Sequence, residues 1–339
     1  MFAAETELKN AQKVKEYLAK HHLFNPDYKL VKELGVIFFP LIKKAKVPHA
    51  LVKNVAFTFP PVEKATTIED ILKSRLTLEE LALLPKAQEI VGNILILEIS
   101  PQLEKKEKLI AEAYLKINKQ IATIVKKKEM HKGVFRTRKV TVLAGKNTKE
   151  TAHLENGVRI KLHLENTYFS ARSAHERLRI AQLVKKEERI LVMFSGVAPY
   201  PLVLAKQSPA KLIYGVELNP IAHRYALENV SLNHLNSQIT LIKGDVCNVL
   251  PKLKLKFDRI IMPLPKTGED FLGIAFKKAK KGAIIHLYAF LEEKDISAQA
   301  RKITAICKEL KHPVKVLRKV KCGQFSPGTF RVCFDLKTI

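Results

Sequence analysis

The second half of the chain alternates short apolar runs with amphipathic segments. The apolar runs have the length of strands, and they cover 190–194, 212–216, 239–242, 257–262, 283–290, 314–320 and 329–336. Ala198-Pro199-Tyr200 opens a helix after the first run, and 295–310 has a helical period. Strands that alternate with helices predict an open α/β sheet of the Rossmann type over residues 166–339.

The first two apolar runs frame a turn and an acid. The run 190–194 ends in Ser195-Gly196, where a glycine lets the backbone approach a ligand closely. The run 212–216 ends on Glu217, about 20 residues later, where a carboxylate can accept both hydroxyls of a ribose. A dinucleotide site needs Gly-x-Gly-x-x-Gly, so this single glycine favours a nucleoside without phosphates, such as S-adenosylmethionine. The alternative is an ordinary turn followed by an incidental glutamate.

Two later runs also end in candidate site residues. Asp245 follows the third run, where its carboxylate can accept the adenine amine, cap the next helix, or do both. Pro263-Leu264-Pro265-Lys266 follows the fourth run, and its prolines fix the backbone so that carbonyl groups can face a target nitrogen. Ligand sites of such sheets lie beyond the carboxyl ends of the strands, so we expect these residues to meet Gly196 and Glu217.

The first half of the chain predicts two smaller α+β units. Residues 6–21 have a helical period, 35–42 form an apolar run of strand length, and Pro60-Pro61 marks a linker. From residue 67, the pattern predicts short helices over 68–84, strands at 90–91 and 94–99, and a long helix over 104–128. Alternating strands follow at 133–143 and 157–164 around a polar loop at 144–151. The predicted domains are therefore 1–60, 67–165 and 166–339.

The segment that leads into the sheet domain has two interpretations. Ser173 and Glu176 have the spacing of a helix capping box, in which case Arg177 is a solvated charge. Alternatively, Tyr168, Phe169 and Arg172 suit stacking on a flipped nucleobase.

The charge balance indicates a polyanionic partner. The chain has 60 Lys and Arg residues and 33 Asp and Glu residues, which gives a formal net charge of +27. This excess of positive charge favours nucleic acid as the partner. A lysine-rich proteome or adaptation to heat is the alternative, although heat adaptation raises Glu together with Lys. No apolar run approaches the roughly 20 residues of a membrane span, and the start of the chain lacks a signal-peptide pattern, so we expect a cytoplasmic protein without a membrane partner. The four cysteines form no Cys-x-x-Cys pair, so neither a metal site nor a disulfide framework is expected.

Several motifs in one order resemble a known family. They are Phe135-Arg136-Thr-Arg138, Leu143-Ala-Gly145, Tyr168-Phe-Ser170, His175-Glu-Arg177, the Phe194–Pro199 turn, Glu217-Leu-Asn-Pro220 and Leu264-Pro-Lys266. Together they resemble the archaeal and eukaryotic tRNA (guanine-37 N1)-methyltransferases over nearly the whole chain. Asn25-Pro-Asp-Tyr28 and the following apolar run are similar to the small N-terminal module of that family.

The resemblance implies a Rossmann-like class I S-adenosylmethionine-dependent methyltransferase domain preceded by two smaller α+β RNA-binding domains. Glu176 would be the general base, and Arg136 would stabilise the guanine O6, because N1 must lose its proton before it attacks. The implied site residues are Glu176, Arg136, Pro263 and Pro265 for catalysis; Tyr168, Phe194, Gly196, Glu217, Asn219, Asp245 and Pro263 for the cofactor; and Arg136, Arg138, Arg172, Arg177 and Lys266 for RNA. The implied partner is tRNA, and a monomer suits three domains that hold one tRNA.

The chain departs from the family pattern at two positions. The family usually has Asp where this chain has Val192, and usually has Asn where this chain has Pro263. An archaeal branch of the family also methylates a wyosine precursor, imG-14, at C7, and the changed pocket is compatible with that second activity. Two alternatives stay open: the related transfer of an aminocarboxypropyl group in wyosine synthesis, and a non-catalytic basic RNA-binding protein. Arg136 and the N-terminal module favour methylation over the first.

Overall fold

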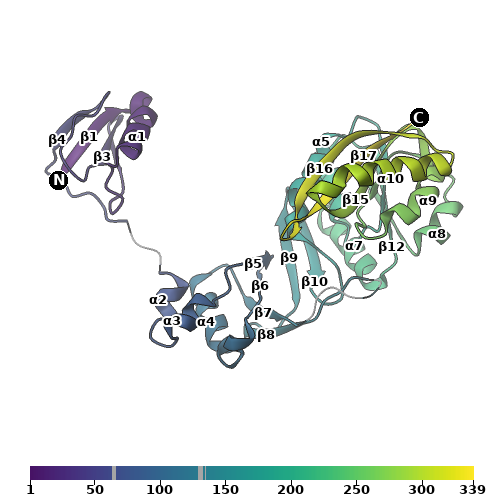
Figure 1. Cartoon of the computed structure of the whole chain (residues 1–339), viewed down its shortest axis with the longest axis horizontal. Coiled ribbons are helices and arrows are strands. Elements are labelled where there is room, and N and C mark those ends of the chain that lie inside the picture. The colour runs from purple at the N-terminus through teal and green to yellow at the C-terminus, as the bar shows by residue number, and fades with distance from the viewer. Residues whose placement is uncertain (63–65, 129–132, 134) are drawn as a thin grey trace. The chain divides into compact units, whose positions relative to one another are not determined.

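A computed structural model describes residues 1–62, 66–128, 133 and 135–339 (Figure 1). The chain divides into two compact units, Met1–Thr67 and Ile68–Ile339. Val134, inside the predicted strand 133–143, lies outside the described residues. Within the described ranges, no helix is both long and apolar enough to cross a membrane.

The first unit is an antiparallel sheet with one helix against it. The strand order is β2–β3–β1–β4, and the elements are β1 Phe2–Glu7, a 3-10 turn Leu8–Asn10, α1 Ala11–Lys20, β2 Val31–Glu33, β3 Val36–Pro40 and β4 Leu51–Asn54. Val14 and Leu18 of α1 pack against Phe39 of β3. The helix predicted over 6–21 therefore starts later, since Thr6 and Glu7 belong to β1, which pairs with a strand on each side.

The second unit begins with a four-stranded sheet of order β5–β6–β7–β8. Its elements are α2 Ile68–Leu72, α3 Leu78–Ala82, β5 Gln88–Val91, β6 Ile94–Leu97, a 3-10 turn Pro101–Lys106, α4 Glu107–Ile117, β7 Thr123–Lys127 and β8 Val140–Gly145. The predicted long helix over 104–128 is wrong. Helix α4 ends at Ile117, where the Asn118 side-chain amide donates to the Tyr114 carbonyl at 2.8 Å. The β-branched run Thr123–Val125 forms an inner strand instead.

A hairpin of β9 Glu150–Glu155 and β10 Val158–His163 follows. Strand β9 overlaps the loop predicted at 144–151, because polar residues alternate with its few apolar ones. The apolar side chains of β10, Val158, Ile160 and Leu162, are buried in the same core as strand β11. The domain boundaries predicted near residues 60 and 166 stay predictions.

A seven-stranded sheet completes the unit in the order β13–β12–β11–β14–β15–β17–β16. Strands β13, β12, β11, β14 and β15 run parallel to one another. Strand β17 pairs antiparallel with β15, and β16 pairs antiparallel with β17. The elements are a 3-10 turn Ala171–Ser173, α5 Ala174–Gln182, β11 Arg189–Met193, α6 Pro199–Gln207, β12 Leu212–Glu217, α7 Pro220–Leu232, β13 Ile239–Lys243, α8 Val246–Val249, a turn Leu250–Lys252, β14 Phe257–Met262, a turn Gly268–Phe271, α9 Leu272–Lys278, β15 Ala279–Glu292, a turn Glu293–Asp295, α10 Ile296–Glu309, β16 Val314–Ser326 and β17 Thr329–Thr338. The predicted strands and the helix over 295–310 are confirmed.

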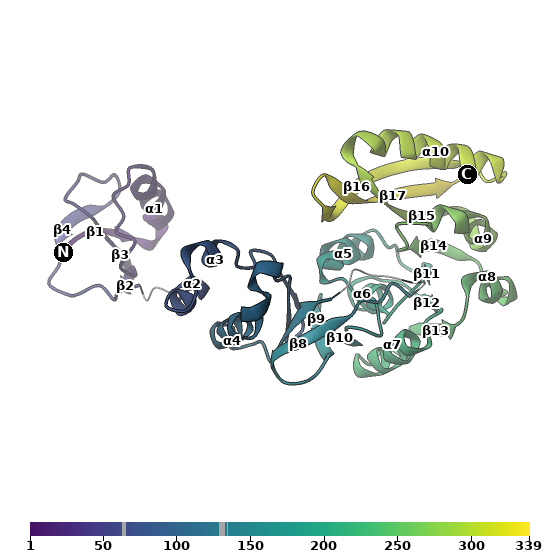
Figure 2. The same cartoon turned by 60° about the horizontal axis from the view of Figure 1, so that its bottom comes forward.

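Helices cover both faces of this sheet (Figure 2). Along β11, Ile190 and Val192 face the core shared with α5, α6 and α7. Leu191 and Met193 face the core shared with α8, α9 and α10. The chain order reverses between β11 and β14, and a sheet of this kind binds its ligand at such a switch point.

Candidate active site

The turn after β11 has an unusual backbone. Phe194, Gly196 and Ala198 have φ values of 59°, 58° and 67°, in the left-handed region that favours glycine. Two of these three residues are not glycine, and strain of this kind clusters at ligand sites. The Ser195 amide donates to the Val216 carbonyl at 2.9 Å, which ties the turn to β12. Helix α6 begins directly after the turn at Pro199.

Glu217 at the end of β12 faces this turn. Its carboxylate accepts the Gly196 amide at 2.6 Å and the Asn219 amide at 2.7 Å. Burial raises the pKa of Glu217, although these backbone hydrogen bonds oppose the shift. A carboxylate can accept about four hydrogen bonds, so it has capacity left for a ligand.

Asn219 and Asp245 both cap helices. The Asn219 side chain accepts the Ile221 amide at 2.9 Å and donates to the Asn166 carbonyl at 2.8 Å, so it is engaged within the protein. Asp245 accepts the Cys247 amide at 2.7 Å, as the capping interpretation expected. It also lines the cavity described next, so capping leaves a ligand role open.

A cavity of about 440 Å³, the large cavity, lies beyond the carboxyl ends of these strands. Among its lining residues are seven predicted cofactor residues, together with Arg136 and Lys266: Tyr168, Phe194, Gly196, Glu217, Asn219, Asp245 and Pro263. Phe271 also lines it and meets the Phe194 ring edge-on at 4.9 Å. No sequence pattern pointed to Phe271, which follows a polar segment. Acids at two points and apolar walls between them suit a nucleoside without phosphates.

Arg136 and Tyr168 stack at one side of the large cavity. The Arg136 guanidinium carbon lies 4.8 Å from the centre of the Tyr168 ring and 5.9 Å from that of Phe290. Arg136 itself has a φ of 50°. A guanidinium positioned by two rings can present its donors to a substrate oxygen.

A second, smaller cavity of about 70 Å³ adjoins the large one, since both are lined by Tyr168, Phe194, Gly196 and Pro263. The small cavity is also lined by Ser195, Pro265, Tyr200, Tyr288 and Arg331, among others. The Ser195 hydroxyl is buried and has no hydrogen-bond partner among the residues that the structure describes. The sequence indicated Pro265 but missed both tyrosines, because each lies in an apolar stretch that predicts only core packing.

Glu176 is buried near this small cavity rather than exposed at a helix end. Its carboxylate forms a bidentate ion pair with Arg179, at 2.7 and 2.8 Å, and accepts the Tyr288 hydroxyl at 2.7 Å. The predicted capping box is wrong, since the Ser173 side chain caps nothing and instead contacts Arg331. Tyr288, which lines the small cavity, connects that cavity to the carboxylate.

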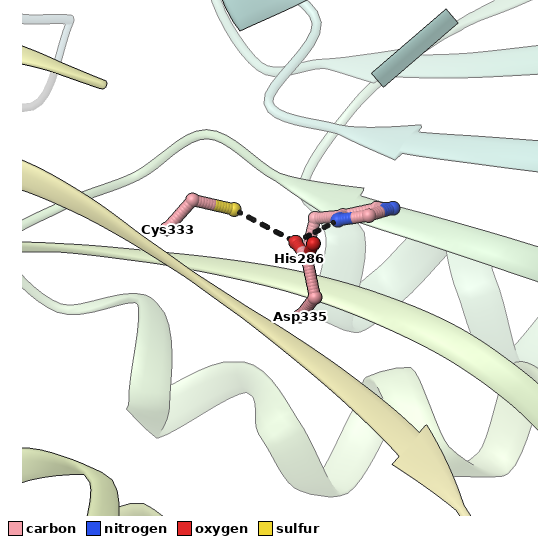
Figure 3. A group of neighbouring side chains, drawn as sticks. All are labelled: His286, Cys333 and Asp335. Atoms are coloured by element: carbon pink, nitrogen blue, oxygen red, sulfur yellow. Dashed lines mark hydrogen bonds and ion pairs between the residues drawn. The ribbon is translucent and has the colours of Figure 1, made fainter. Parts of the chain in front are cut away.

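The Glu176–Arg179 pair continues into a buried ion-pair network, formed by Glu176, Arg179, Asp335, His286, Arg259 and Glu188. Arg179 binds Asp335 at 2.9 Å, and Asp335 contacts the His286 Nδ1 at 2.6 Å. Figure 3 shows His286 and Cys333 on either side of the Asp335 carboxylate. Burial lowers the pKa of His286, and Arg259 donates to its Nε2 at 2.7 Å, so His286 is neutral with its proton on Nδ1.

His286, Cys333 and Asp335 have the spacing of metal ligands. Two guanidinium groups, Arg179 and Arg259, already donate to members of this trio, however. Their positive charges oppose a bound cation, and so the cluster is a structural hydrogen-bond network.

The predicted RNA-binding arginines fall into two groups. Arg138 is buried in a bidentate pair with Glu89, at 2.9 and 3.2 Å. Arg177 is buried in a bidentate pair with Glu155, at 2.5 Å for both contacts, and the solvated charge expected there is wrong. Both guanidinium groups are thus engaged by carboxylates, and Arg177 also lines the small cavity. Arg172 and Lys266 are exposed.

The parallel sheet, the glycine turn and the acid at the end of β12 define a class I S-adenosylmethionine-dependent methyltransferase, and the lining of the large cavity suits its cofactor. The chain belongs to the TRM5/TYW2 methyltransferase family. Residues 151–317 match the TRM5/TYW2 methyltransferase domain, 68–148 the TYW2 N-terminal domain, and 6–48 the tRNA methyltransferase 5 N-terminal domain.

Three curated relatives illustrate the range of this family. The tRNA (guanine(37)-N(1))-methyltransferase Trm5b of Pyrococcus abyssi is 30% identical over 99% of this chain and 98% of its own length. The tRNA(Phe) (4-demethylwyosine(37)-C(7)) aminocarboxypropyltransferase of Pyrococcus horikoshii is 31% identical over 80% of this chain and 95% of its own. The tRNA (guanine(37)-N(1))/4-demethylwyosine(37)-methyltransferase Taw22 of Nanoarchaeum equitans is 32% identical over 66% of this chain and 90% of its own length.

Solved structures also match this chain over nearly its whole length, and two of them illustrate the similarity. The crystal structure of Trm5b from Pyrococcus abyssi has a TM-score of 0.77 at 30% identity, covering 100% of this chain and 99% of that one. The complex of aTrm5 and tRNALeu has a TM-score of 0.70 at 26% identity, covering 99% of both chains.

Proposed function

We propose that the protein transfers the methyl group of S-adenosylmethionine to N1 of guanosine 37 in tRNA. The observation that carries this proposal is Arg136, a guanidinium at the wall of the same cavity that Glu217 and Asp245 line. The nucleoside part of the cofactor would lie between the two acids, and the sulfonium methyl supplies the transferred group. Arg136 would then face the base that receives it.

The chain's own residues would activate the base. Guanine N1 carries a proton at neutral pH, and negative charge moves to O6 as that proton leaves. The Arg136 guanidinium would stabilise O6. Glu176 would take the proton through the Tyr288 hydroxyl: the N1–H bond breaks, that proton passes to Tyr288, and the proton of Tyr288 passes to the carboxylate. Pro263 and Pro265 would shape the wall against which the base lies.

The experiment that tests the proposal is nucleoside mass spectrometry of tRNA incubated with the protein and S-adenosylmethionine. We expect a singly methylated guanosine with the N1 fragmentation pattern. An added aminocarboxypropyl group would instead identify the activity named for the Pyrococcus horikoshii relative. No modification by protein that binds the cofactor would favour a non-catalytic RNA-binding role.

A wyosine precursor is the second candidate substrate. Pro263 stands where the family has Asn, and proline offers no side-chain acceptor beside the target atom, so the pocket discriminates less by hydrogen bonding. Taw22, whose name covers both substrates, is similar to two thirds of the chain. Incubation with tRNA that carries imG-14 tests this point: methylation at C7 supports it, and unchanged imG-14 removes it.

The three predicted domains would divide the work, with residues 1–60 reading the body of the tRNA and 67–165 holding the anticodon stem. Deleting residues 1–60 should leave S-adenosylmethionine affinity unchanged and weaken binding of whole tRNA. If the folded truncation lost cofactor affinity instead, this division would be wrong. We also propose a monomer that works in the cytoplasm, since a single chain would supply both the cofactor site and the tRNA contacts.

A further inference from the structure

Phe325, near the end of β16, is an exposed aromatic residue with one face covered. Its ring stacks on Phe290 of β15, with centroids 4.0 Å apart and planes at 29°. The residue is still 46% exposed. A single exposed apolar side chain is ordinary, so its surroundings decide whether it has a role.

The rings beneath Phe325 lead to the large cavity. Arg331 lies over the Phe290 ring at 6.0 Å and Arg136 at 5.9 Å, and Arg136 lies in turn over Tyr168. The Phe290 amide donates to the Pro265 carbonyl at 3.3 Å. Rings and guanidinium groups therefore form a continuous row from the proposed target site to the exposed face of Phe325.

Two exposed cationic residues lie on segments that run beside this row. A Cβ added at Gly323, two residues before Phe325, would lie 4.0 Å from the Arg172 carbonyl, so this part of β16 runs beside the exposed Arg172. Exposed Lys266 follows Pro265, to which Phe290 is bonded. Aromatic faces interleaved with cations are the surface that binds unpaired nucleobases and their phosphates.

We propose that Phe325 and Phe290 form a stacking platform for an unpaired nucleobase next to the target guanine in the RNA loop. The inference rests on the proposed function. A target base that leaves its stack exposes the faces of its neighbours, at a cost of unstacking. The Phe325 ring would replace the lost stacking partner of one base next to the target. The row of rings and guanidinium groups connects this ring to the pocket of the flipped base.

The test compares Phe325→Ala with Phe325→Tyr and with Leu317→Ala, by binding to an anticodon stem-loop RNA in the presence of S-adenosylhomocysteine. Leu317 is the matched control because it lies on the same strand and is 44% exposed. Phe325→Ala should bind the RNA about 5-fold to 100-fold more weakly, the usual scale for one stacked base. Phe325→Tyr and Leu317→Ala should bind like the unchanged protein, and all three should keep its cofactor affinity and thermal unfolding.

The same stem-loop with one base removed, at each position beside the target in turn, identifies the stacked base. At one position the loss should weaken binding by the unchanged protein but not by Phe325→Ala, because that variant has already lost the contact. Full-strength binding by Phe325→Ala, or an equal effect of every missing base on both proteins, would overturn the platform. These measurements need no turnover, so they are independent of which atom is methylated.

Discussion

The large cavity and the buried ion-pair network use carboxylates in opposite ways. Glu217 in the cavity accepts hydrogen bonds from backbone amides and from no cation among the described residues. Asp335 in the network accepts from Arg179 and His286, and these bonds outweigh the effect of burial and hold its pKa well below the ordinary value. A carboxylate with capacity left can bind a ligand, whereas one surrounded by cations fixes the fold.

Glu176 belongs to both regions. Arg179 ties it to the network, and the Tyr288 hydroxyl ties it to the small cavity. A general base needs both properties, since it must be ionised before the reaction and reachable by the proton. Experiments that separate these two roles test the comparison.

The largest expected effect is on stability. Arg179→Met leaves Glu176 and Asp335 buried without their shared cation, and unpaired buried charges cost about 3–5 kcal/mol of unfolding free energy. Urea denaturation measures it. Arg224→Met is the control, because that exposed pair with Glu228 is worth about 1 kcal/mol or less. Similar losses in both variants would mean that the network is no more stabilising than a surface pair.

Glu176→Gln separates chemistry from folding. If Glu176 accepts the N1 proton, single-turnover methyl transfer should fall about 100-fold or more, while cofactor and tRNA affinities stay nearly unchanged. Raising the pH should restore part of the rate, because hydroxide replaces the missing acceptor. A normal rate of single-turnover methyl transfer at neutral pH would contradict the assignment of Glu176 as the general base.

Arg136→Lys is the companion variant of that experiment. Its rate should also fall, since the point charge of an ammonium cannot copy the two donors of a guanidinium at O6. It should show no recovery at higher pH, because the proton acceptor is still present. Recovery in both variants would assign the pH effect to the substrate rather than to Glu176.

Glu217→Ala tests whether the Glu217 carboxylate, which has hydrogen-bonding capacity left, binds the cofactor. S-adenosylmethionine binding should weaken by about 1–3 kcal/mol, the scale of hydrogen bonds to a charged group. Calorimetry without tRNA measures this loss. Unchanged affinity in a folded variant would remove Glu217 from the cofactor site.

The smallest effect is a pH dependence of cofactor affinity. Burial raises the pKa of Glu217, so protonation begins at a higher pH than for an ordinary glutamate. Ribose hydroxyls bind the ionised form better, and affinity should therefore fall as pH falls through that raised pKa and recover as pH rises. Glu217→Gln, which cannot ionise, should bind with a flatter pH profile. Identical profiles would show that Glu217 does not govern the dependence.

The sequence alone determined the sheet domain and most of the large cavity. Strand β11, its turn and Glu217 lie within about 30 residues, the span of one βαβ unit, so a local pattern contains the whole arrangement. Asp245 and Pro263 follow from the rule that ligand residues end parallel strands. Prediction from the sequence failed at β9, where polar residues obscure the two-residue period of a strand. It also failed at β7, where the helical pattern continues into a strand.

The partners of the buried charges follow from the tertiary structure and from no sequence pattern. Arg179 and Asp335 are 156 residues apart, and Glu89 and Arg138 are 49 apart. Whether an arginine faces RNA or a buried carboxylate depends on which strands become neighbours, and no local period encodes that choice. The same holds for Phe325 and Phe290, whose rings stack although β17 lies between their strands β16 and β15.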